Sequence, residues 1–285
     1  MKILSVFLAT FISTNLQAKT FYVVNAEVKQ GDTLVVRIDP SFQGPLVCLS
    51  AFERQYRPNK YGYVFMGISA DTKPTQDMPD KAKYLLYLVE CGRGVRLDWN
   101  YEEFSVLKKS FPEIRIRANM TVVDSRRRAK EGEAISKAYA KGSSWEWHPD
   151  GGFVNPLGVV EITDAFGVKR SYLNGESRHG GVDLRASVGT QVRAVNSGVV
   201  VLTARGFSLE GNMVIVDHGS GVFSLYLHLS KINVKENQKV KKSQEIGLSG
   251  SSGAVTGPHL HFMVKANGAN VDPLSFIGTF SQYLK

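Results

Sequence analysis

The sequence predicts a mostly β protein with two β-rich parts joined by one helix. Short runs of β-branched and aromatic residues recur between turns rich in Gly, Pro and Asp, a pattern typical of small antiparallel sheets. Hydrophobic residues make up 43% of the 285 residues and charged residues 21%, which is the composition of a globular chain. We expect an immunoglobulin-like β-sandwich over residues 19–118, a helical linker over 119–152 and an antiparallel β-sheet domain over 153–285.

Residues 1–18 have the layout of a secretory signal peptide. Lys2 precedes the apolar stretch Ile3–Ile12, and Ala18 stands at the expected cleavage point. The apolar stretch is too short to cross a bilayer, so we expect no transmembrane anchor. The sequence therefore predicts a mature protein that is periplasmic or secreted.

The first β-rich part shows strand signals but no catalytic pattern. Runs at residues 33–38, 46–49 and 84–89 each follow a turn or polar loop, and no histidine occurs before His148. Cys48 and Cys91 could form a disulfide in an exported protein, or remain two buried thiols.

The charged, alanine-rich stretch at residues 125–141 predicts a surface helix that ends near Gly142. An arginine patch that binds RNA is the alternative for its first residues, but Glu131 and Glu133 soon interrupt the basic run. The formal net charge of +9 fits an anionic partner such as a bacterial cell wall. No basic cluster alternates with aromatic residues, and we therefore expect no nucleic-acid partner.

The last part of the chain predicts consecutive hairpins. The runs at 190–195 and 199–202 are joined through Asn196-Ser197-Gly198, and those at 213–216 and 222–227 are joined through a glycine-containing turn. No strong helix pattern intervenes, and we therefore expect largely antiparallel sheets.

Two pairs of polar residues in this part predict a metal centre. His259 and His261 lie two apart in an extended run, so their side chains share one face of a strand. His179 and Asp183 flank two glycines, which disfavour a helix. A catalytic zinc takes three protein ligands and keeps one position for water. We assign His179, Asp183 and His261 as the ligands.

Two further histidines, His228 and His259, are the candidates for catalysis beside the metal. A zinc ion lowers the pKa of its water and polarises a carbonyl, and a nearby imidazole can accept a proton or stabilise the oxyanion. The sequence does not divide these roles. Local hydrogen bonding accounts for His218 at a turn, and His148 lies in the linker.

The segment from Phe153 to Gly278 resembles the lysostaphin/LytM-type zinc metallopeptidases, which cut peptidoglycan peptides. In that family, positions matching His179, Asp183 and His261 bind zinc, and those matching His228 and His259 are catalytic. The matching stretches are Phe166-Gly167, His179-Gly180-Gly181-Val182-Asp183, residues 211–219, Leu225-Tyr226-Leu227-His228-Leu229, residues 253–261 and Val271-Asp272-Pro273-Leu274.

The resemblance implies an antiparallel β-sheet with its site in a groove, a bacterial source and the stem peptides of peptidoglycan as substrate. D-alanyl cross-links are the expected bond. Two alternatives remain: a silent wall-binding regulator of other hydrolases, and a secreted protease of glycine-rich proteins. We also expect that the N-terminal region could inhibit the enzyme intramolecularly, through the sandwich or the helix at 126–141.

Overall fold

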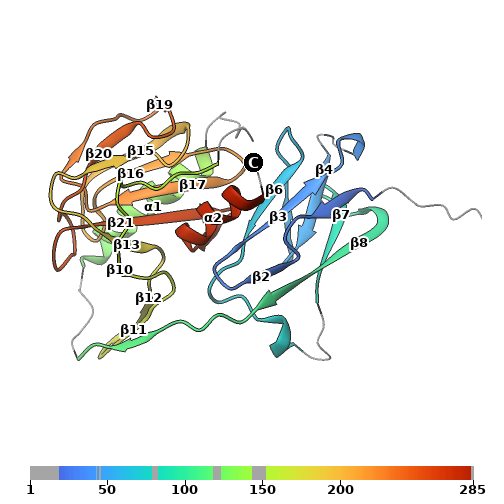
Figure 1. Ribbon diagram of the computed structural model, residues 1–285, viewed down its shortest axis with the longest axis horizontal. Coiled ribbons are helices and arrows are strands. Elements are labelled where there is room, and N and C mark those ends of the chain that lie inside the picture. Colours follow the sequence, from blue (N-terminus) through green and yellow to red (C-terminus); the bar gives the residue numbers. More distant parts are fainter. Residues whose placement is uncertain are drawn as a thin grey trace, which may run out of the picture.

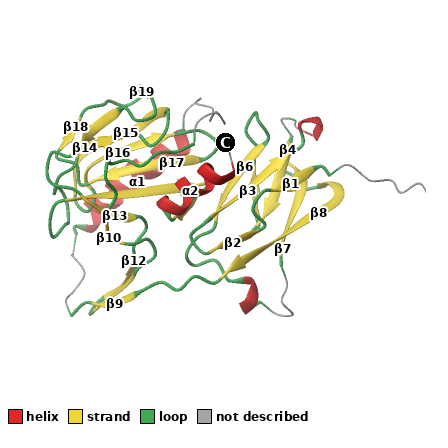
Figure 2. Cartoon of the chain, in the orientation of Figure 1, coloured by secondary structure: helices red, strands yellow, loops and turns green. Residues whose placement is uncertain are grey.

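The computed structural model describes residues 19–42, 44, 46–78, 83–117, 123–142 and 152–283. Two β-rich parts lie next to each other, and the chain is mostly β, as the sequence predicts (Figures 1 and 2). The predicted signal peptide at 1–18 and residues 143–151 of the linker fall outside the described residues.

The N-terminal part consists of two sheets around a common core, which matches the predicted sandwich. A three-stranded sheet has the order β1-β3-β6 and a five-stranded sheet the order β2-β8-β7-β4-β5. Leu34 of the first sheet and Leu86 and Phe104 of the second are fully buried in one cluster. The elements are β1 (Phe21–Val23), β2 (Glu27–Lys29), β3 (Thr33–Ile38), η1 (Pro40–Phe42), β4 (Val47–Ala51), β5 (Arg54–Tyr56), β6 (Tyr63–Gly67), η2 (Thr75–Asp77), β7 (Tyr84–Glu90) and β8 (Arg96–Leu107).

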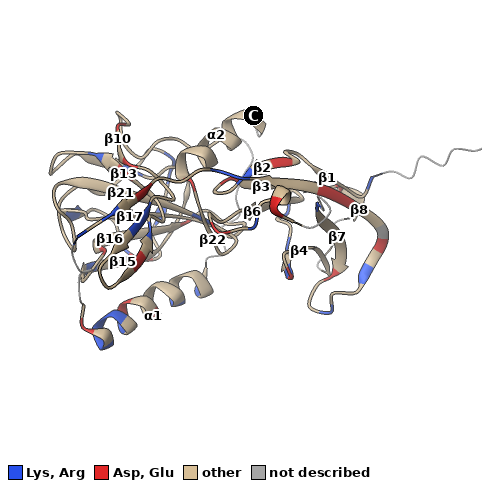
Figure 3. Ribbon diagram, turned by 90° about the horizontal axis from the view of Figure 1, so that it is seen from below, with Lys and Arg blue, Asp and Glu red and all other residues tan. Residues whose placement is uncertain are grey.

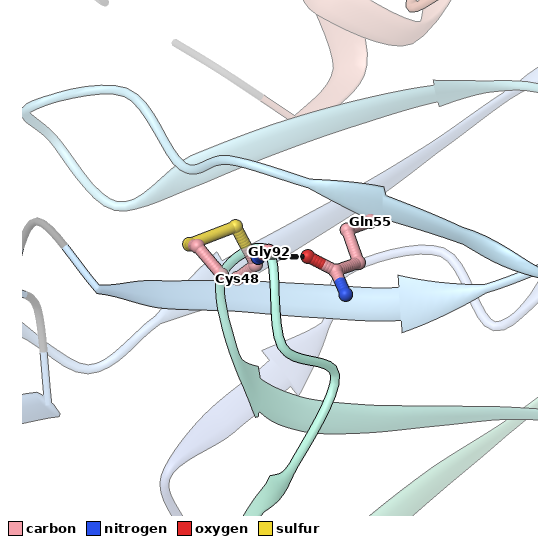
Figure 4. Close-up of a disulfide and its surroundings, with 4 residues drawn as sticks. Cys48, Gln55 and Gly92 are labelled. Carbon is pink, nitrogen blue, oxygen red and sulfur yellow. Dashed lines mark hydrogen bonds between the residues drawn. A yellow bond between two sulfur atoms is a disulfide. The ribbon is translucent and has the colours of Figure 1, made fainter.

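A disulfide links β4 to the end of its neighbour β7 in the five-stranded sheet. Cys48 in β4 is bonded to Cys91, the residue after β7, which resolves the two alternatives left by the sequence. Next to the bond, the Gly92 N–H donates to the Gln55 side-chain oxygen over 2.6 Å (Figure 4). The bridge closes a loop of 43 residues, which restricts the unfolded chain.

The C-terminal part is built on an eight-stranded sheet of order β10-β13-β21-β17-β16-β15-β19, with β22 paired to β21. All of its pairings are antiparallel. The hairpin predicted from residues 213–216 and 222–227 is present as β16 and β17. The hairpin predicted from residues 190–195 and 199–202 is wrong: β14 pairs with β20, whereas β15 pairs with β16 and β19, so the chain passes from one sheet to another at residues 194–197. Two three-stranded sheets, β14-β20-β18 and β12-β11-β9, flank it. The remaining elements are β9 (Glu113–Arg115), β10 (Ile162–Asp164), β11 (Lys169–Tyr172), β12 (Gly175–Arg178), β13 (Val182–Arg185), β14 (Gln191–Arg193), β15 (Gly198–Phe207), β16 (Gly211–Asp217), β17 (Val222–Leu227), β18 (Lys231–Ile232), β19 (Lys239–Val240), β20 (Glu245–Leu248), β21 (His259–Ala266), β22 (Ala269–Val271) and α2 (Pro273–Tyr283).

The predicted helix is present as α1 (Ser125–Lys141). Its N-cap is Asp124, whose carboxylate accepts the Arg127 N–H over 2.7 Å, and it ends at Gly142, where φ is 52°. The helix does not simply connect two parts, because Ala138 is buried against apolar side chains of β15, β16 and β17. Figure 3 shows α1 alongside these strands.

The two faces of the large sheet have different partners. In β21, Leu260, Phe262 and Val264 are buried in the main core on one face. Because side chains alternate, His261 and Met263 lie on the other face, which α1 partly covers.

The main core joins the two β-rich parts. Val35 and Phe65 of the N-terminal part belong to the same buried cluster as Phe276 and Phe280 of α2. The Phe65 and Phe280 ring centroids lie 4.9 Å apart. Lys109 and Asp272 form an ion pair of 2.9 Å across the same junction. The boundaries predicted at 118 and 153 therefore divide the sequence but not the apolar core.

Among the described residues, no helix is both long enough and apolar enough to cross a membrane.

Candidate metal centre

Two strands bring Asp183 and His261 together. Asp183 of β13 and His261 of β21 are directly opposite in an antiparallel pair. Their side chains point to the same face of the sheet, and Asp183 Oδ1 lies 2.6 Å from His261 Nδ1. Residues 78 positions apart in the sequence thus become neighbours through strand register.

His179 completes a three-residue cluster. Its Nε2 lies 3.1 Å from Asp183 Oδ1 and 3.1 Å from His261 Nδ1. Its Nδ1 lies 2.7 Å from the Ala165 carbonyl oxygen, which fixes the ring with Nδ1–H as the donor. The backbone is held on both sides, because the His179 N–H donates to Val168 and its carbonyl accepts from Gly167.

The two glycines between His179 and Asp183 pack closely against β21, and Gly181 is the tighter of the two. A Cβ on Gly181 would lie 2.3 Å from the Phe262 carbonyl oxygen and 2.6 Å from Met263 Cγ. A Cβ on Gly180 would lie 3.0 Å from Met263 Cε. A larger residue at Gly181 would push this segment away from β21, and with it the His179 ring, because the clash is with backbone. At Gly180 the added atom would meet only side-chain ends, which can shift.

His228 and His259 lie beside the cluster, and in each ring Nδ1 is close to a backbone carbonyl oxygen. His228 follows β17 in a left-handed conformation with φ of 62°, and its Nδ1 lies 2.9 Å from the Ser252 carbonyl oxygen. His259 Nδ1 lies 2.9 Å from the Gly257 carbonyl oxygen. Their ring centroids are 4.9 Å apart. In both rings Nδ1 donates to a carbonyl, so Nε2 is the nitrogen left to accept a proton.

The electrostatics of the cluster keep Asp183 ionised. Burial opposes its charge, but hydrogen bonds from His179 and His261 outweigh burial and hold the pKa of Asp183 well below its usual range. Burial also opposes charge on His179, yet the Asp183 hydrogen bond and charge leave the pKa of His179 raised. At His261 burial dominates and lowers the pKa. Burial, assisted by the charge of His261, lowers the pKa of His228 to about 4.

Two charged residues that sequence reasoning missed surround the cluster. Asp164 Oδ2 lies 3.7 Å from His179 Nδ1, and Arg170 contacts Asp164 and lies 4.0 Å from Asp183 Oδ2. They come from β10 and β11, whose sequences carry no metal-binding spacing. Only the pairing of β10 with β13 brings Asp164 next to the site.

The donor set fits a divalent metal such as zinc. Two imidazole nitrogens and one carboxylate oxygen converge within 4.8 Å of one another, and borderline nitrogen with hard oxygen suits Zn²⁺. His218 does not belong to the cluster. It is fully buried, and its two ring nitrogens form hydrogen bonds with the Ser197 carbonyl oxygen and the Ser224 hydroxyl. His148 lies outside the described residues.

Comparisons with known proteins agree with this site. Residues 177–273 match the model of peptidase family M23. Over 96 residues the chain is 47% identical to the peptidoglycan DD-endopeptidase ShyA of Vibrio cholerae, covering 34% of this chain and 22% of that protein. Over 127 residues it is 39% identical to the DD-carboxypeptidase/endopeptidase Mpg of Neisseria meningitidis, covering 44% of this chain and 29% of that protein.

The matched part thus spans between about a fifth and a third of these two relatives. A crystal structure of a candidate peptidase M23 from Pseudomonas aeruginosa aligns over 90% of this chain and 97% of that one, with a TM-score of 0.65 and 27% identity. The structural alignment therefore includes the N-terminal part of this chain as well as the part that carries the metal cluster. The chain carries a C-terminal peptidase family M23 domain, and the resemblance to lysostaphin/LytM-type metallopeptidases is confirmed.

Proposed function

We propose that this protein is an exported, zinc-dependent endopeptidase that hydrolyses peptide cross-links of bacterial peptidoglycan, most of all D-alanyl bonds. The observation that carries the proposal is the convergence of His179, Asp183 and His261 within a peptidase M23 domain. The relatives named DD-endopeptidases favour the D-alanyl bond over other cross-links. The net charge of +9 suits an anionic wall.

The residues beside the cluster supply the proton chemistry. Zinc held by His179 Nε2, Asp183 Oδ1 and His261 Nδ1 would supply Lewis acidity toward a scissile carbonyl and a water molecule. His228 and His259 each keep Nε2 as an acceptor, so that either can take a proton from the attacking water or, once protonated, donate to the oxyanion. The lowered pKa of His228 keeps it neutral at pH 7.

A comparison of substrates separates this proposal from its two alternatives. Zinc-loaded protein is incubated with cross-linked muropeptide dimers and, in parallel, with a glycine-rich elastin-like peptide. Cleavage of the dimers alone, at the D-alanyl bond, is the expected result. Cleavage of the elastin-like peptide alone would identify a protease of glycine-rich proteins. Bound zinc with no cleavage by any variant would favour a wall-binding regulator.

We also propose that α1 inhibits the enzyme intramolecularly by covering part of the substrate groove. Ala138 of α1 belongs to the same buried cluster as Met213, Leu225 and Leu227, which lie on the same face of the sheet as the metal-binding residues. Leu227 is directly opposite His261 in the strand pairing. Buried polar contacts hold the other end of the helix: Glu131, 6% exposed, accepts the Ser208 N–H over 2.9 Å.

On the side of the cluster away from α1, a loop of the N-terminal sandwich restricts the space for a substrate. Asp71 forms an ion pair of 3.1 Å with Arg178, the residue before His179. Ser69 and Ala70 join these residues around a cavity of about 190 Å³ that also touches His179. A long peptide therefore meets α1 on one side of the cluster and the loop at 69–71 on the other.

Two alanines of α1 provide a matched test of inhibition. Ala138→Asp places a carboxylate in the apolar contact with the sheet, and Ala140→Asp places the same group on the exposed side of the same turn. Burial of an unpaired charge is strongly unfavourable, so the first change should displace α1. We expect Ala138→Asp to cleave muropeptide dimers faster than wild type and Ala140→Asp to match wild type. Equal rates for both, with circular dichroism unchanged, would show that α1 does not obstruct the groove.

A further inference from the structure

The strand that carries His261 also carries a lysine on the same face. Burial alternates along β21, so that His259, His261, Met263 and Lys265 all lie on the side of α1 and the metal cluster. His261 and Lys265 are four residue steps apart on an extended strand, which is roughly 13 Å along β21. A peptide with its scissile bond at the cluster would reach Lys265 about four residues away.

Lys265 has no counter-charge among the described residues. Its Nζ lies 3.3 Å from Asn270 Oδ1 and 5.1 Å from the centre of the Tyr139 ring, and no described carboxylate lies within ion-pair distance of it. Burial, followed by the charge of Arg54, lowers the pKa of Lys265. The positive charge of a half-buried ammonium group is only partly stabilised by an amide oxygen and an aromatic ring. An anion would satisfy it better than either neighbour does.

The surroundings of Lys265 leave room for a ligand. A cavity of about 230 Å³ separates α1 from the sheet, and its floor is formed by Leu225, Leu227, Met263, Lys265 and Asn270. The floor therefore offers an apolar surface that ends in a cation and an amide. Tyr139 of α1 lines the same cavity and covers the ammonium group.

We propose that Lys265 and Asn270 form a subsite that binds a free carboxylate of the peptide substrate, with Tyr139 occupying this subsite when α1 is in place. The ligand class is an acidic peptide whose small apolar side chains lie on Leu225 and Met263. Lys265 would pair with the carboxylate, and the Asn270 amide would donate a second hydrogen bond. The inference rests on the proposed function, because it takes the groove beside His261 as the substrate groove.

The test compares charged and neutral forms of one substrate. In the Ala138→Asp chain, kcat and KM are measured for a muropeptide dimer with free carboxylates and for the same dimer with those carboxylates amidated. A hydrogen bond to a charged group changes affinity by roughly tenfold to a hundredfold. We expect Lys265→Met to raise KM for the free-carboxylate dimer by that factor with little change in kcat, and to leave the amidated dimer unaffected. Lys265→Arg should retain most of the preference.

Equal effects of Lys265→Met on both dimers would overturn the subsite, since loss of packing does not distinguish a carboxylate from an amide. Calorimetric titration with a non-cross-linked stem peptide, free or amidated, tests the same point without turnover. If no variant cleaves any dimer but Lys265 still governs binding of the free carboxylate, the proposed function fails and the subsite stands. If dimers are cleaved and amidation changes neither KM nor binding, the subsite fails and the proposed function stands.

Discussion

At the scale of the residue, the candidate site depends on where each imidazole directs its nitrogens. His179 is held through Nδ1 and offers Nε2, whereas His261 offers Nδ1 to the same Asp183 oxygen. His259 Nε2 lies 3.6 Å from that oxygen, beyond hydrogen-bond distance. Two histidines separated by one residue on a single strand therefore occupy different positions relative to the cluster, although the alternation of the strand gives both the same face.

Substitution of single histidines should separate metal binding from turnover. We expect His179→Ala and His261→Ala to lose zinc and activity together, because each removes a proposed ligand. His259→Ala should keep its zinc and lose turnover by about a hundredfold or more, the usual effect of removing a general base. Metal content by mass spectrometry and muropeptide cleavage are measured on the same samples. A zinc-free His259→Ala protein would place His259 among the ligands.

Gly181 should tolerate no side chain. In Gly181→Ala the new Cβ would lie 2.3 Å from the Phe262 carbonyl oxygen, so β13 and β21 must separate. Overpacking of this kind costs typically about 1–3 kcal/mol of unfolding free energy. Gly158→Ala is the control, because no heavy atom lies within 4 Å of its added Cβ. Urea unfolding of both variants checks the prediction, and equal midpoints would refute the close-packing argument.

At the scale of the element, the sequence predicts the kind of structure better than its packing partner. The bounds of α1 follow from its charged, alanine-rich pattern and from Gly142. The packing of α1 on the sheet does not follow from the sequence. Its contact face carries only Ile135, Ala138 and Tyr139, and such spacing is common in solvated helices. Likewise, Asp164 joins the site through strand pairing, which no local pattern encodes.

The hairpin of β16 and β17 should make the fold sensitive to acid. Burial lowers the pKa of His218 to about 4, against an ordinary value of 6.5, although the Ser197 carbonyl opposes the shift. The unfolded chain therefore binds the proton more readily between these values, and the free energy of unfolding falls as pH drops from 6.5 to 4, by about 3 kcal/mol. Denaturant unfolding of wild type and His218→Gln at pH 7 and pH 4.5 measures the effect. Identical pH dependence in both proteins would contradict it.

At the scale of the whole molecule, the N-terminal part is a structural component of the peptidase domain. Phe65 packs on Phe280, Asn267 donates to the Phe65 carbonyl over 2.7 Å, and the Ser275 hydroxyl donates to Asp32 over 2.6 Å. The sequence predicts both parts and the five candidate site residues, since strand alternation and ligand chemistry are local. It does not predict this junction, because the residues that form it are ordinary apolar and polar residues of two separate segments.

Removal of the N-terminal part should therefore destabilise the remainder. The fragment 153–285 loses Val35, Phe65 and Ala70 from the main core. Each large buried apolar side chain contributes about 1.5–3 kcal/mol, so we expect the fragment to melt well below the full chain or to aggregate. The chain beginning at Lys19 serves as the control and should melt like the full chain. A fragment with the melting temperature of the full chain would show that the shared core is dispensable.

The proposed zinc-dependent endopeptidase activity is tested most directly by chromatography of cross-linked peptidoglycan after digestion by the zinc-loaded Ala138→Asp chain, with and without a chelator. We expect dimers to be converted to monomers by cleavage at the D-alanyl bond, the chelator to abolish the conversion, and added zinc to restore it. Conversion that persists in the chelator would contradict the metal mechanism, and dimers left intact in every sample would contradict the endopeptidase.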